Sequence, residues 1–488
     1  MEKTIKIRTN FIYNLVYQIL TIILPLVTAP YVSRVLKSNN IGVYSYTQAA
    51  ANYFFLFAML GVNNYGNRTI AAVRDDKEKL SAVFWEIYVF QFIIGLIVNI
   101  SYLVYCLCFI KQDVLVSFLQ FFYVASAIFN INWLCFGLEK FKLTTIRNIL
   151  VRLGMAVAVF LFVKKETDLP IYTAILAGGN LISVLVIWPF ALKYVPFRKP
   201  KVAGIVRHIK PNLVLFWPVV AISLYNIMDK LMLGAKDVTK QEVGFYTYAE
   251  NIVQIPNTLI LALDNVIMPR MSNLYANEKE SAATNLMNHV MLFAMLASAA
   301  MAFGLASVSP VFVPWFYGEE FMPCILLVSL LCPVIIFKGW AGALRTQYII
   351  PKKKDRIYII SLTAGAIVNL IINYFLIPIY AGIGAAIGTI AAEFSVAFIQ
   401  FLFVRKEVPI MEYIKNGIAF CIIGICMFAI IYNMRDIPLD APLVILIQII
   451  TGGVVYMSAA VFYIVKVKKN PVLINEGLKM LHIKYRFK

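Results

Sequence analysis

Four polar side chains recur at helical spacing inside one otherwise apolar stretch, residues 243 to 268. They are Glu250, Gln254, Asn257 and Asp264, and this spacing places them on one face of the helix that the stretch predicts. A carboxyl group within an apolar span is costly unless it faces water or a partner, and desolvation lets it exchange protons near neutral pH. The pattern predicts a face for ion coupling, and a polar seam between two helices is the alternative.

Two further acidic residues lie inside apolar stretches. Glu86 stands about two helical turns inside its stretch, and Asp229 is followed directly by Lys230. Because successive helical residues point about 100° apart, Asp229 and Lys230 need not pair with each other. With Glu250 and Asp264, Glu86 and Asp229 are the candidates for proton or cation coupling. For Asp229 and Lys230, a partly hydrated place near the membrane surface is the alternative.

Five basic residues are the candidates for binding a phosphate-bearing substrate: Arg34, Arg68, Arg152, Arg270 and Lys338. Guanidinium groups bind phosphate oxygens through two parallel hydrogen bonds, which suits them to this task. The arginines at positions 34, 68 and 270 stand at helix ends, where each alone would be an interfacial anchor. A sixth basic residue, Arg147, fits a side chain that reaches out of its span to the interface.

The sequence carries no pattern for catalysis, for a cofactor or for a metal ion. It lacks the GxxxxGK[ST] loop of nucleotide hydrolases and the GxSxG motif of serine hydrolases. Its three histidines are scattered, and its seven cysteines form no CxxC pair. We therefore expect a protein that is not an enzyme.

The composition excludes a soluble fold. Of the 488 residues, 61% are hydrophobic and only 14% are charged, and the mean hydropathy is +0.79. Apolar stretches of bilayer-spanning length, about 20 residues, predict an all-α polytopic membrane protein with about fourteen transmembrane helices. They lie near residues 11–36, 41–64, 80–107, 114–138, 143–163, 169–192, 212–234, 243–268, 287–314, 321–344, 357–378, 381–404, 416–433 and 441–465.

The net charge of +19 follows the membrane rather than a nucleic acid. If the N-terminus is cytoplasmic and the spans alternate, most lysines and arginines fall on the inner side, as the positive-inside rule requires. Both termini are then cytoplasmic. The basic tail between Lys466 and Lys488 is suited to anionic headgroups, so membrane lipid is an expected partner and nucleic acid is not.

An internal repeat indicates two like-oriented halves. Residues 243–248 (VGFYTY) repeat residues 41–46 (IGVYSY), and the same spacing places Arg270 on Arg68. A polar connection from Lys193 to Lys210 falls midway between the copies. With six helices in each half, the copies enter the membrane in the same direction, as parallel repeats do. We predict six-helix bundles over 1–200 and 201–406, and over 407–488 two additional helices with the basic cytoplasmic tail.

A family resemblance rests on motifs along most of the chain. The run NLIINYFLIPIYAGIGAAIGTIAAE holds Asn369, Asn373, Pro378, Gly382 and Glu393. Further matches are Pro30 and Arg34, then Asp229 and the pair Pro269 and Arg270. These motifs resemble the bacterial polysaccharide biosynthesis flippases of the multidrug, oligosaccharidyl-lipid and polysaccharide exporter superfamily.

The resemblance implies a function and its partners. Such a flippase carries an undecaprenyl-diphosphate-linked oligosaccharide, for capsule, O-antigen or a related glycan, from the cytoplasmic to the outer leaflet of the bacterial inner membrane. Its two bundles enclose a chamber that opens alternately to each side. A glycan polymerase and glycosyltransferases of the same pathway are expected partners. Because the first helix lacks an arginine-rich run, a peptidoglycan-precursor flippase is disfavoured.

Two other functions stay open from the sequence. One is a cation-coupled multidrug or small-molecule antiporter of the same superfamily, which would favour an acidic or aromatic chamber. The other is a membrane glycan polymerase or transferase, which would need a sizeable outer loop. The predicted chamber holds more bases than acids, and no predicted outer loop is long, so both are disfavoured.

Overall fold

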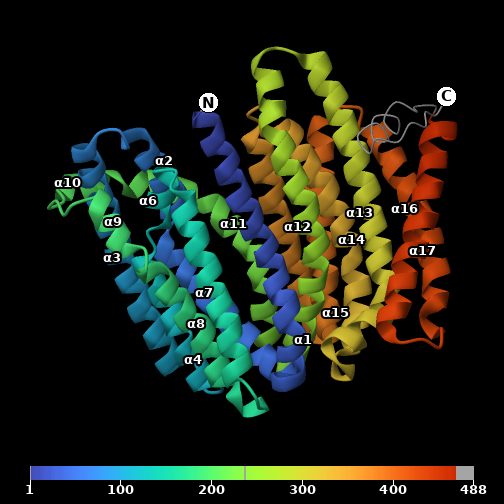
Figure 1. The fold of residues 1–488 in the computed structure, drawn as a ribbon, viewed down its shortest axis with the longest axis horizontal. Coiled ribbons are helices and arrows are strands. Elements are labelled where there is room, and N and C mark those ends of the chain that lie inside the picture. Colours follow the sequence, from blue (N-terminus) through green and yellow to red (C-terminus); the bar gives the residue numbers. More distant parts are fainter. Residues whose placement is uncertain (1, 236–237, 469–488) are drawn as a thin grey trace. The chain divides into compact units, whose positions relative to one another are not determined.

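The structure, a computed structural model, describes residues 2–235 and 238–468, with the backbone alone for residues 2–22, 141, 217–218, 221–222, 224–226, 263 and 265. Throughout these residues the chain forms helices joined by turns, with no strand (Figure 1). Combined with the apolar composition, this confirms the predicted all-α polytopic membrane protein. Most of the predicted basic tail lies outside the described residues.

Contacts between Cα atoms divide the chain into two compact units, which we call unit 1 (Met1–Gly244) and unit 2 (Phe245–Lys488). Helices α1 to α11 belong to unit 1, and α13 to α17 with nearly all of α12 belong to unit 2. The predicted boundaries at residues 200 and 406 and the parallel relation of the halves stay predictions.

The helices of unit 1 are mostly apolar segments separated by short turns. Their bounds are α1 Glu2–Met59, α2 Val62–Val73, α3 Lys77–Cys108, α4 Val114–Leu119, α5 Phe121–Phe129, α6 Asn132–Gly137, α7 Phe141–Phe162, α8 Leu169–Leu185, α9 Trp188–Tyr194, α10 Val202–Arg207 and α11 Ile209–Ala235.

The α-helices of unit 2 each have at least 22 residues. Their bounds are α12 Lys240–Ala276, α13 Glu280–Tyr317, α14 Pro323–Leu344, α15 Asp355–Val404, α16 Ile410–Tyr432 and α17 Ala441–Phe462. A π-helical turn, Arg345–Ile349, continues α14, and another, Tyr463–Val467, continues α17.

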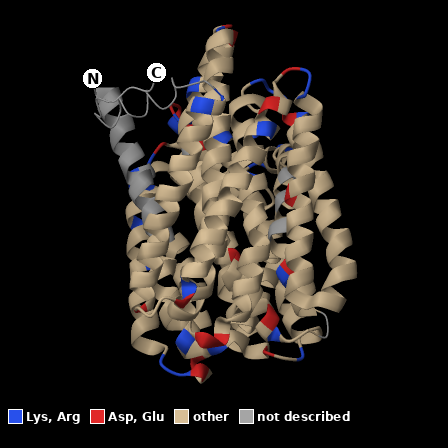
Figure 2. Ribbon diagram, turned by 90° about the vertical axis from the view of Figure 1, so that its right-hand side faces the viewer, with Lys and Arg blue, Asp and Glu red and all other residues tan. Residues whose placement is uncertain are grey.

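Among the described residues, ten helices are long and apolar enough to cross a membrane. One of them, α15, contains two predicted spans, and the three predicted spans near 11–36, 41–64 and 212–234 lie in α1 and α11. Figure 2 shows that charged residues gather near the helix ends and leave the middle of most helices uncharged. This is the distribution that a bilayer imposes.

The second predicted span ends earlier than the sequence indicated. Helix α1 stops at Met59, and the chain turns through Leu60 and Gly61, whose φ angles are 37° and 81°. A Cβ atom on Gly61 would lie 2.9 Å from the backbone oxygen of Asn212, so this turn needs a glycine. Arg68 consequently lies on the separate helix α2.

The membrane segment that comprises α4, α5 and α6 is broken inside unit 1. Asn130 and Ile131 leave helical geometry between α5 and α6. Broken backbone at membrane depth needs hydrogen-bond partners from the protein. Gln91 supplies one, because its Nε2 donates to the carbonyl oxygen of Asn130 at 3.0 Å, and Trp133 Nε1 orients Gln91 by donating to its Oε1 at 2.9 Å.

Helix α15 is a hairpin of two helical halves. Ala381 breaks it with a φ of 47°, three residues after Pro378. The halves pack closely, since Gln400 Nε2 donates to Ser361 Oγ at 3.2 Å. A Cβ atom on Gly384 would lie 2.5 Å from the oxygen of Leu376, which explains the glycine after the break.

Candidate functional site

The predicted site residues are distributed over both units. Unit 1 holds Arg34 on α1, Arg68 on α2, Glu86 on α3, Arg152 on α7 and Asp229 on α11, and unit 2 holds Glu250, Asp264 and Arg270 on α12 and Lys338 on α14. Within each unit, the structure shows which of these side chains have partners and which line a cavity.

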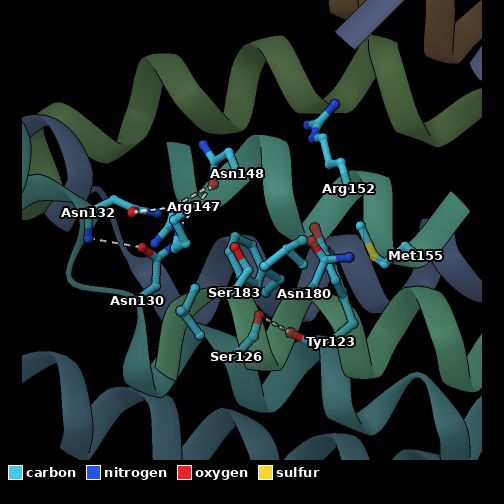
Figure 3. A pocket seen from close by; sticks show the side chains of 13 residues that line it. Tyr123, Ser126, Asn130, Asn132, Arg147, Asn148, Arg152, Met155, Asn180 and Ser183 are labelled. Atoms are coloured by element: carbon cyan, nitrogen blue, oxygen red, sulfur yellow. Dashed lines mark hydrogen bonds between the residues drawn. The ribbon is translucent and has the colours of Figure 1, made fainter. Parts of the chain in front are cut away.

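A polar cavity of about 210 Å³ lies inside unit 1. Thirteen side chains line it, including Arg147 and Arg152 from α7, Asn130 from the break after α5 and Asn132 from the start of α6 (Figure 3). Since a single water needs only roughly 10 to 15 Å³ on this measure, the cavity has room for a polar group of several atoms.

Arg147 is a buried basic residue that lines this cavity. Its Nη2 donates to Asn132 Oδ1 at 3.1 Å and to Asn148 Oδ1 at 2.5 Å, while Arg152 extends in another direction (Figure 3). The residues that line the cavity include two arginines, several amides and hydroxyls, and no aspartate or glutamate. Such a lining binds polar or anionic groups, because guanidinium and amide groups donate hydrogen bonds.

The sequence indicated Arg152 but passed over Arg147. With 6% of its surface exposed, Arg147 is buried rather than directed outward to the interface as the sequence suggested. The signal that was available was the series of asparagines in three neighbouring spans, Asn130, Asn148 and Asn180, which line the same cavity. Amides in apolar spans seek one another or a shared polar space.

Glu86 belongs to a cluster at one end of unit 1, the Glu86 cluster, formed with Tyr65, Arg207 and His208. Arg207 Nη2 donates to Glu86 Oε2 at 2.6 Å, and His208 Nε2 lies 3.4 Å from the same oxygen. His208 Nδ1 and the Tyr65 hydroxyl share a hydrogen bond of 2.7 Å. These contacts hold α10, in the polar connection, against α3, so the structure gives Glu86 a structural explanation beside the predicted coupling role.

Burial lowers the pKa of His208, and the positive charge of Arg207 acts in the same direction. The hydrogen bond and charge of Glu86 oppose this shift without reversing it. The imidazole is therefore buried in its neutral form at neutral pH.

The other predicted residues of unit 1 differ in burial. Asp229 is buried in α11 and lies within electrostatic range of Tyr53, whose hydroxyl donates to the oxygen of Ser223 at 3.2 Å. Arg34 and Arg68 are exposed, and Arg34 Nη1 donates to the carbonyl oxygen of Pro30 at 2.8 Å. Their predicted roles in substrate binding stay predictions.

In unit 2, Lys338 is paired with a carboxylate. Its Nζ lies 3.2 Å from Oε1 of Glu393, which is buried on the second half of α15. A lysine and a glutamate inside apolar helices stabilise each other in this way, because either charge alone would be costly there. The pair joins α14 to α15.

Asp264 is buried where α12 meets the end of α14. Gln347 Nε2 donates to its backbone oxygen at 3.0 Å, and a Cβ atom on Gly342 would lie 3.2 Å from its Oδ2. Arg345 acts on the carboxylate through its charge. The sequence did not indicate Arg345 or Gln347, because each sits alone at the end of an apolar span.

The four polar side chains predicted to form a stripe along one face of α12 differ in burial. Asn257 and Asp264 are buried, Glu250 is half-buried and Gln254 is exposed. Arg270, near the end of the helix, is exposed as well. The stripe therefore passes through more than one environment, and the coupling role of Glu250 and Asp264 stays a prediction.

Residues of the long family-like run form a polar contact set within unit 2. Asn373 Nδ2 donates to Asn369 Oδ1 at 3.1 Å, and Thr389 shares a hydrogen bond of 2.9 Å with Tyr246 on α12. A Cβ atom on Gly388 would lie 1.9 Å from Asn373 Oδ1.

In the described residues, no group of three or more His, Cys, Asp or Glu side chains is arranged to hold a metal ion.

An apolar groove of about 540 Å³, the α17 groove, lies in unit 2 among α12, α13, α16 and α17. Pro256, Met301, Phe312 and Met457 are among the side chains that line it, and Gln448 is a rare polar one. Two of these helices, α16 and α17, are those that the sequence analysis placed outside the repeated halves. A groove with this lining accepts a hydrocarbon chain.

A comparison with family models decides the family. Residues 7–275, more than half of the chain, match the model described as polysaccharide biosynthesis protein. The chain belongs to this family. The resemblance drawn from the sequence motifs is thereby confirmed.

Curated relatives of the chain include two transporters. A putative O-antigen transporter of Escherichia coli (strain K12) is 23% identical over 408 residues, covering 83% of this chain and 98% of the relative. A putative O-antigen transporter of Shigella dysenteriae is 22% identical over 384 residues, covering 76% and 92%.

Solved structures share the fold. The lipid II flippase MurJ in an inward closed conformation gives a TM-score of 0.70 at 18% identity, covering 93% of this chain and 98% of that one. An inward-facing multidrug resistance MATE transporter gives 0.58 at 16% identity, covering 83% and 99%. At these identities the comparison establishes the fold alone.

Proposed function

We propose that this family member is a flippase that moves a lipid-linked oligosaccharide from the cytoplasmic to the outer leaflet of the bacterial inner membrane by alternating access. Membership in the polysaccharide biosynthesis family and similarity to two O-antigen transporters support this function. The carrier is an undecaprenyl diphosphate, and both termini are cytoplasmic.

The polar cavity of unit 1 is the observation that carries the proposal. It places the charge of Arg147 and Arg152 among amide and hydroxyl groups, within helices that are otherwise apolar. Hydroxyl-rich sugars need many hydrogen-bond partners, and a diphosphate needs positive charge. This lining offers both kinds of group. In this proposal Arg34, Arg68, Arg270 and Lys338 also hold the diphosphate or line its route.

The α17 groove suits the other half of the substrate. An undecaprenyl chain is a long hydrocarbon, and the groove is lined almost wholly by apolar side chains. The polar cavity and the apolar groove thus suit the two chemically different parts of such a substrate. Energy for the cycle comes from ion coupling at Asp229, Glu250 or Asp264, because a buried carboxylate that gains or loses a proton biases one conformation.

The basic lining disfavours a cation antiporter. A cationic drug would need an acidic or aromatic cavity, whereas the residues that line the polar cavity include two arginines and no acid. Transport of a lipid-linked glycan also makes the chain a partner of the glycosyltransferases and polymerase that precede and follow it, rather than an enzyme of glycan synthesis.

Surface glycan in a strain that depends on this chain tests the proposal. We expect Arg152→Glu and Arg270→Glu each to abolish surface glycan while the protein still accumulates in the membrane. Arg435→Glu, at an exposed residue that pairs with Asp436, reverses the same charge and serves as the control with normal glycan. Undiminished glycan in both test variants would remove the proposed substrate site, and uptake of a fluorescent cation by vesicles would favour the antiporter.

A further inference from the structure

A second groove lies on the outside of unit 1, between α7 and the pair α8 and α9. It has a volume of about 670 Å³, and we call it the α7–α9 groove. Ile146 and Leu150 from α7 line it together with Val186 and Phe190 from the other side. Helices α7, α8 and α9 lie in candidate membrane spans, so the groove is open to hydrocarbon.

The charges of this groove are all at one end and all positive. Lys140 and Lys142, just before and at the start of α7, form the mouth, and Arg147 lies one to two turns further in. No acidic residue is among the side chains that line the groove. The neighbouring Glu139, which is not among the lining residues, pairs with Arg74 at 2.6 Å.

Lys140 is positioned at the mouth by an aromatic ring. Its Nζ lies 5.4 Å from the ring centre of Tyr194, the last residue of α9. A cation over an aromatic ring keeps its full charge while its position becomes restricted. The mouth therefore joins the beginning of α7 to the end of α9.

The apolar part of the groove consists of exposed side chains. Leu150 is 64% exposed, Val186 55% and Ile146 40%. Within a bilayer such surface is normal, but here it is concave and continuous with a positively charged mouth. An apolar cleft with lysines at one end matches a molecule that joins a phosphate to a hydrocarbon chain.

From this charge complementarity we propose that the α7–α9 groove is a binding site for an acidic phospholipid. Lys140 and Lys142 bind the headgroup phosphate, Arg147 adds positive potential from the floor, and an acyl chain lies along Ile146, Leu150 and Phe190. The site is separate from the α17 groove and does not depend on the proposed transport function. Its effect is to hold α7 and α9 together through a bound lipid.

Native mass spectrometry of the purified full chain tests this site with phosphatidylglycerol and phosphatidylcholine of identical acyl chains. We expect the wild type to bind the acidic lipid at least tenfold more tightly. Lys140→Gln with Lys142→Gln should lower phosphatidylglycerol affinity roughly thirtyfold, since each surface lysine near an anionic lipid contributes a factor of about five. Phosphatidylcholine affinity should stay the same.

A matched control removes the same charge from the other end of α7. Lys164→Gln with Lys165→Gln should leave both affinities unchanged, because these exposed residues lie beyond Phe162. A second test keeps the lysines and changes the apolar lining of the groove. Ile146→Asn with Leu150→Asn should weaken the binding of both lipids, while the preference for phosphatidylglycerol persists. These outward-facing changes keep the test available if the lysine variant folds poorly.

Three results would overturn the assignment. One is equal binding of the two lipids by the wild type, and another is the same loss in the Lys140/Lys142 and Lys164/Lys165 variants. The third is displacement of phosphatidylglycerol by equimolar undecaprenyl phosphate through the same lysines, which would assign the groove to a carrier lipid instead.

Discussion

The carboxylate of Glu86 and the guanidinium of Arg207 form an ion pair of 2.6 Å that ties α10 to α3. The carboxylate is 8% exposed and the arginine side chain 58% exposed, so the pair lies at the edge of the unit with its acid inside. A Cβ atom on Gly204 would lie 2.0 Å from Glu86 Oε1, which shows how closely α10 packs on the acid. The polar connection is thus fixed to unit 1 at this point.

Replacing Glu86 by alanine should destabilise unit 1 by about 1 to 3 kcal/mol, because Arg207 loses its buried acceptor and His208 loses the carboxylate beside it. Thermal unfolding of the purified protein measures the effect. Glu78→Ala is the matched control, since Glu78 pairs at 3.6 Å with Arg198 of the same connection but is 85% exposed. We expect less than about 0.5 kcal/mol there, and equal losses in both variants would contradict a special role for Glu86.

Acid should weaken the Glu86 cluster through His208. The pKa of this imidazole is below its ordinary value of about 6.5 because it is buried beside Arg207. The unfolded chain then binds the proton more readily, so the stability contribution is complete above pH 6.5 and is lost as the pH falls toward the folded pKa. Unfolding temperatures between pH 8 and pH 5 should fall more steeply for the wild type than for His208→Gln. His289→Gln, in α13, should leave the wild-type slope unchanged.

Gly388 should not tolerate even a methyl group. A Cβ atom there would lie 1.9 Å from Asn373 Oδ1, in the contact between the two halves of α15. We expect Gly388→Ala to destabilise unit 2 by about 1 to 3 kcal/mol, as overpacking does. At Gly178 nothing lies within 4 Å of an added Cβ atom, so Gly178→Ala should be neutral or stabilise α8 by up to about 1 kcal/mol. The denaturant midpoint of Gly388→Ala should lie below that of the wild type. The midpoint of Gly178→Ala should equal that of the wild type or lie above it.

The helices and the family were predictable from the sequence because apolar length and ordered motifs are local properties. The helix breaks were predictable only in part. The break at Ala381 falls where the predicted spans 357–378 and 381–404 meet, whereas Gly61 marks a turn inside the predicted span 41–64, where hydropathy changes little. Burial of Glu86 and Asp264 agrees with the apolar stretches that contain them, and burial of Asp229 disfavours the partly hydrated alternative that its neighbour Lys230 had left open.

The partners of the charged residues could not be predicted in the same way. Glu86 meets Arg207, and Lys338 meets Glu393, across distances in sequence that no helical period connects. The surroundings of Arg147 could not be predicted either, because a position near the end of a span suits a surface anchor as well as a residue that lines a cavity. Only the packing of α7 against the break after α5 separates these two explanations.

The Lys338 and Glu393 pair should behave as a buried ion pair whose halves depend on each other. Removing one partner leaves a charge in an apolar setting, so Lys338→Met or Glu393→Leu alone should cost about 3 kcal/mol or more. The double variant replaces both charges by apolar groups of similar size and should cost less than the two single losses combined. Thermal unfolding of the four proteins gives the coupling. Additive losses would show that the 3.2 Å contact contributes little and would leave Lys338 available to a substrate. Strong coupling would instead assign Lys338 chiefly to holding α14 on α15. Its predicted role in binding the diphosphate would then require a conformation in which the pair separates.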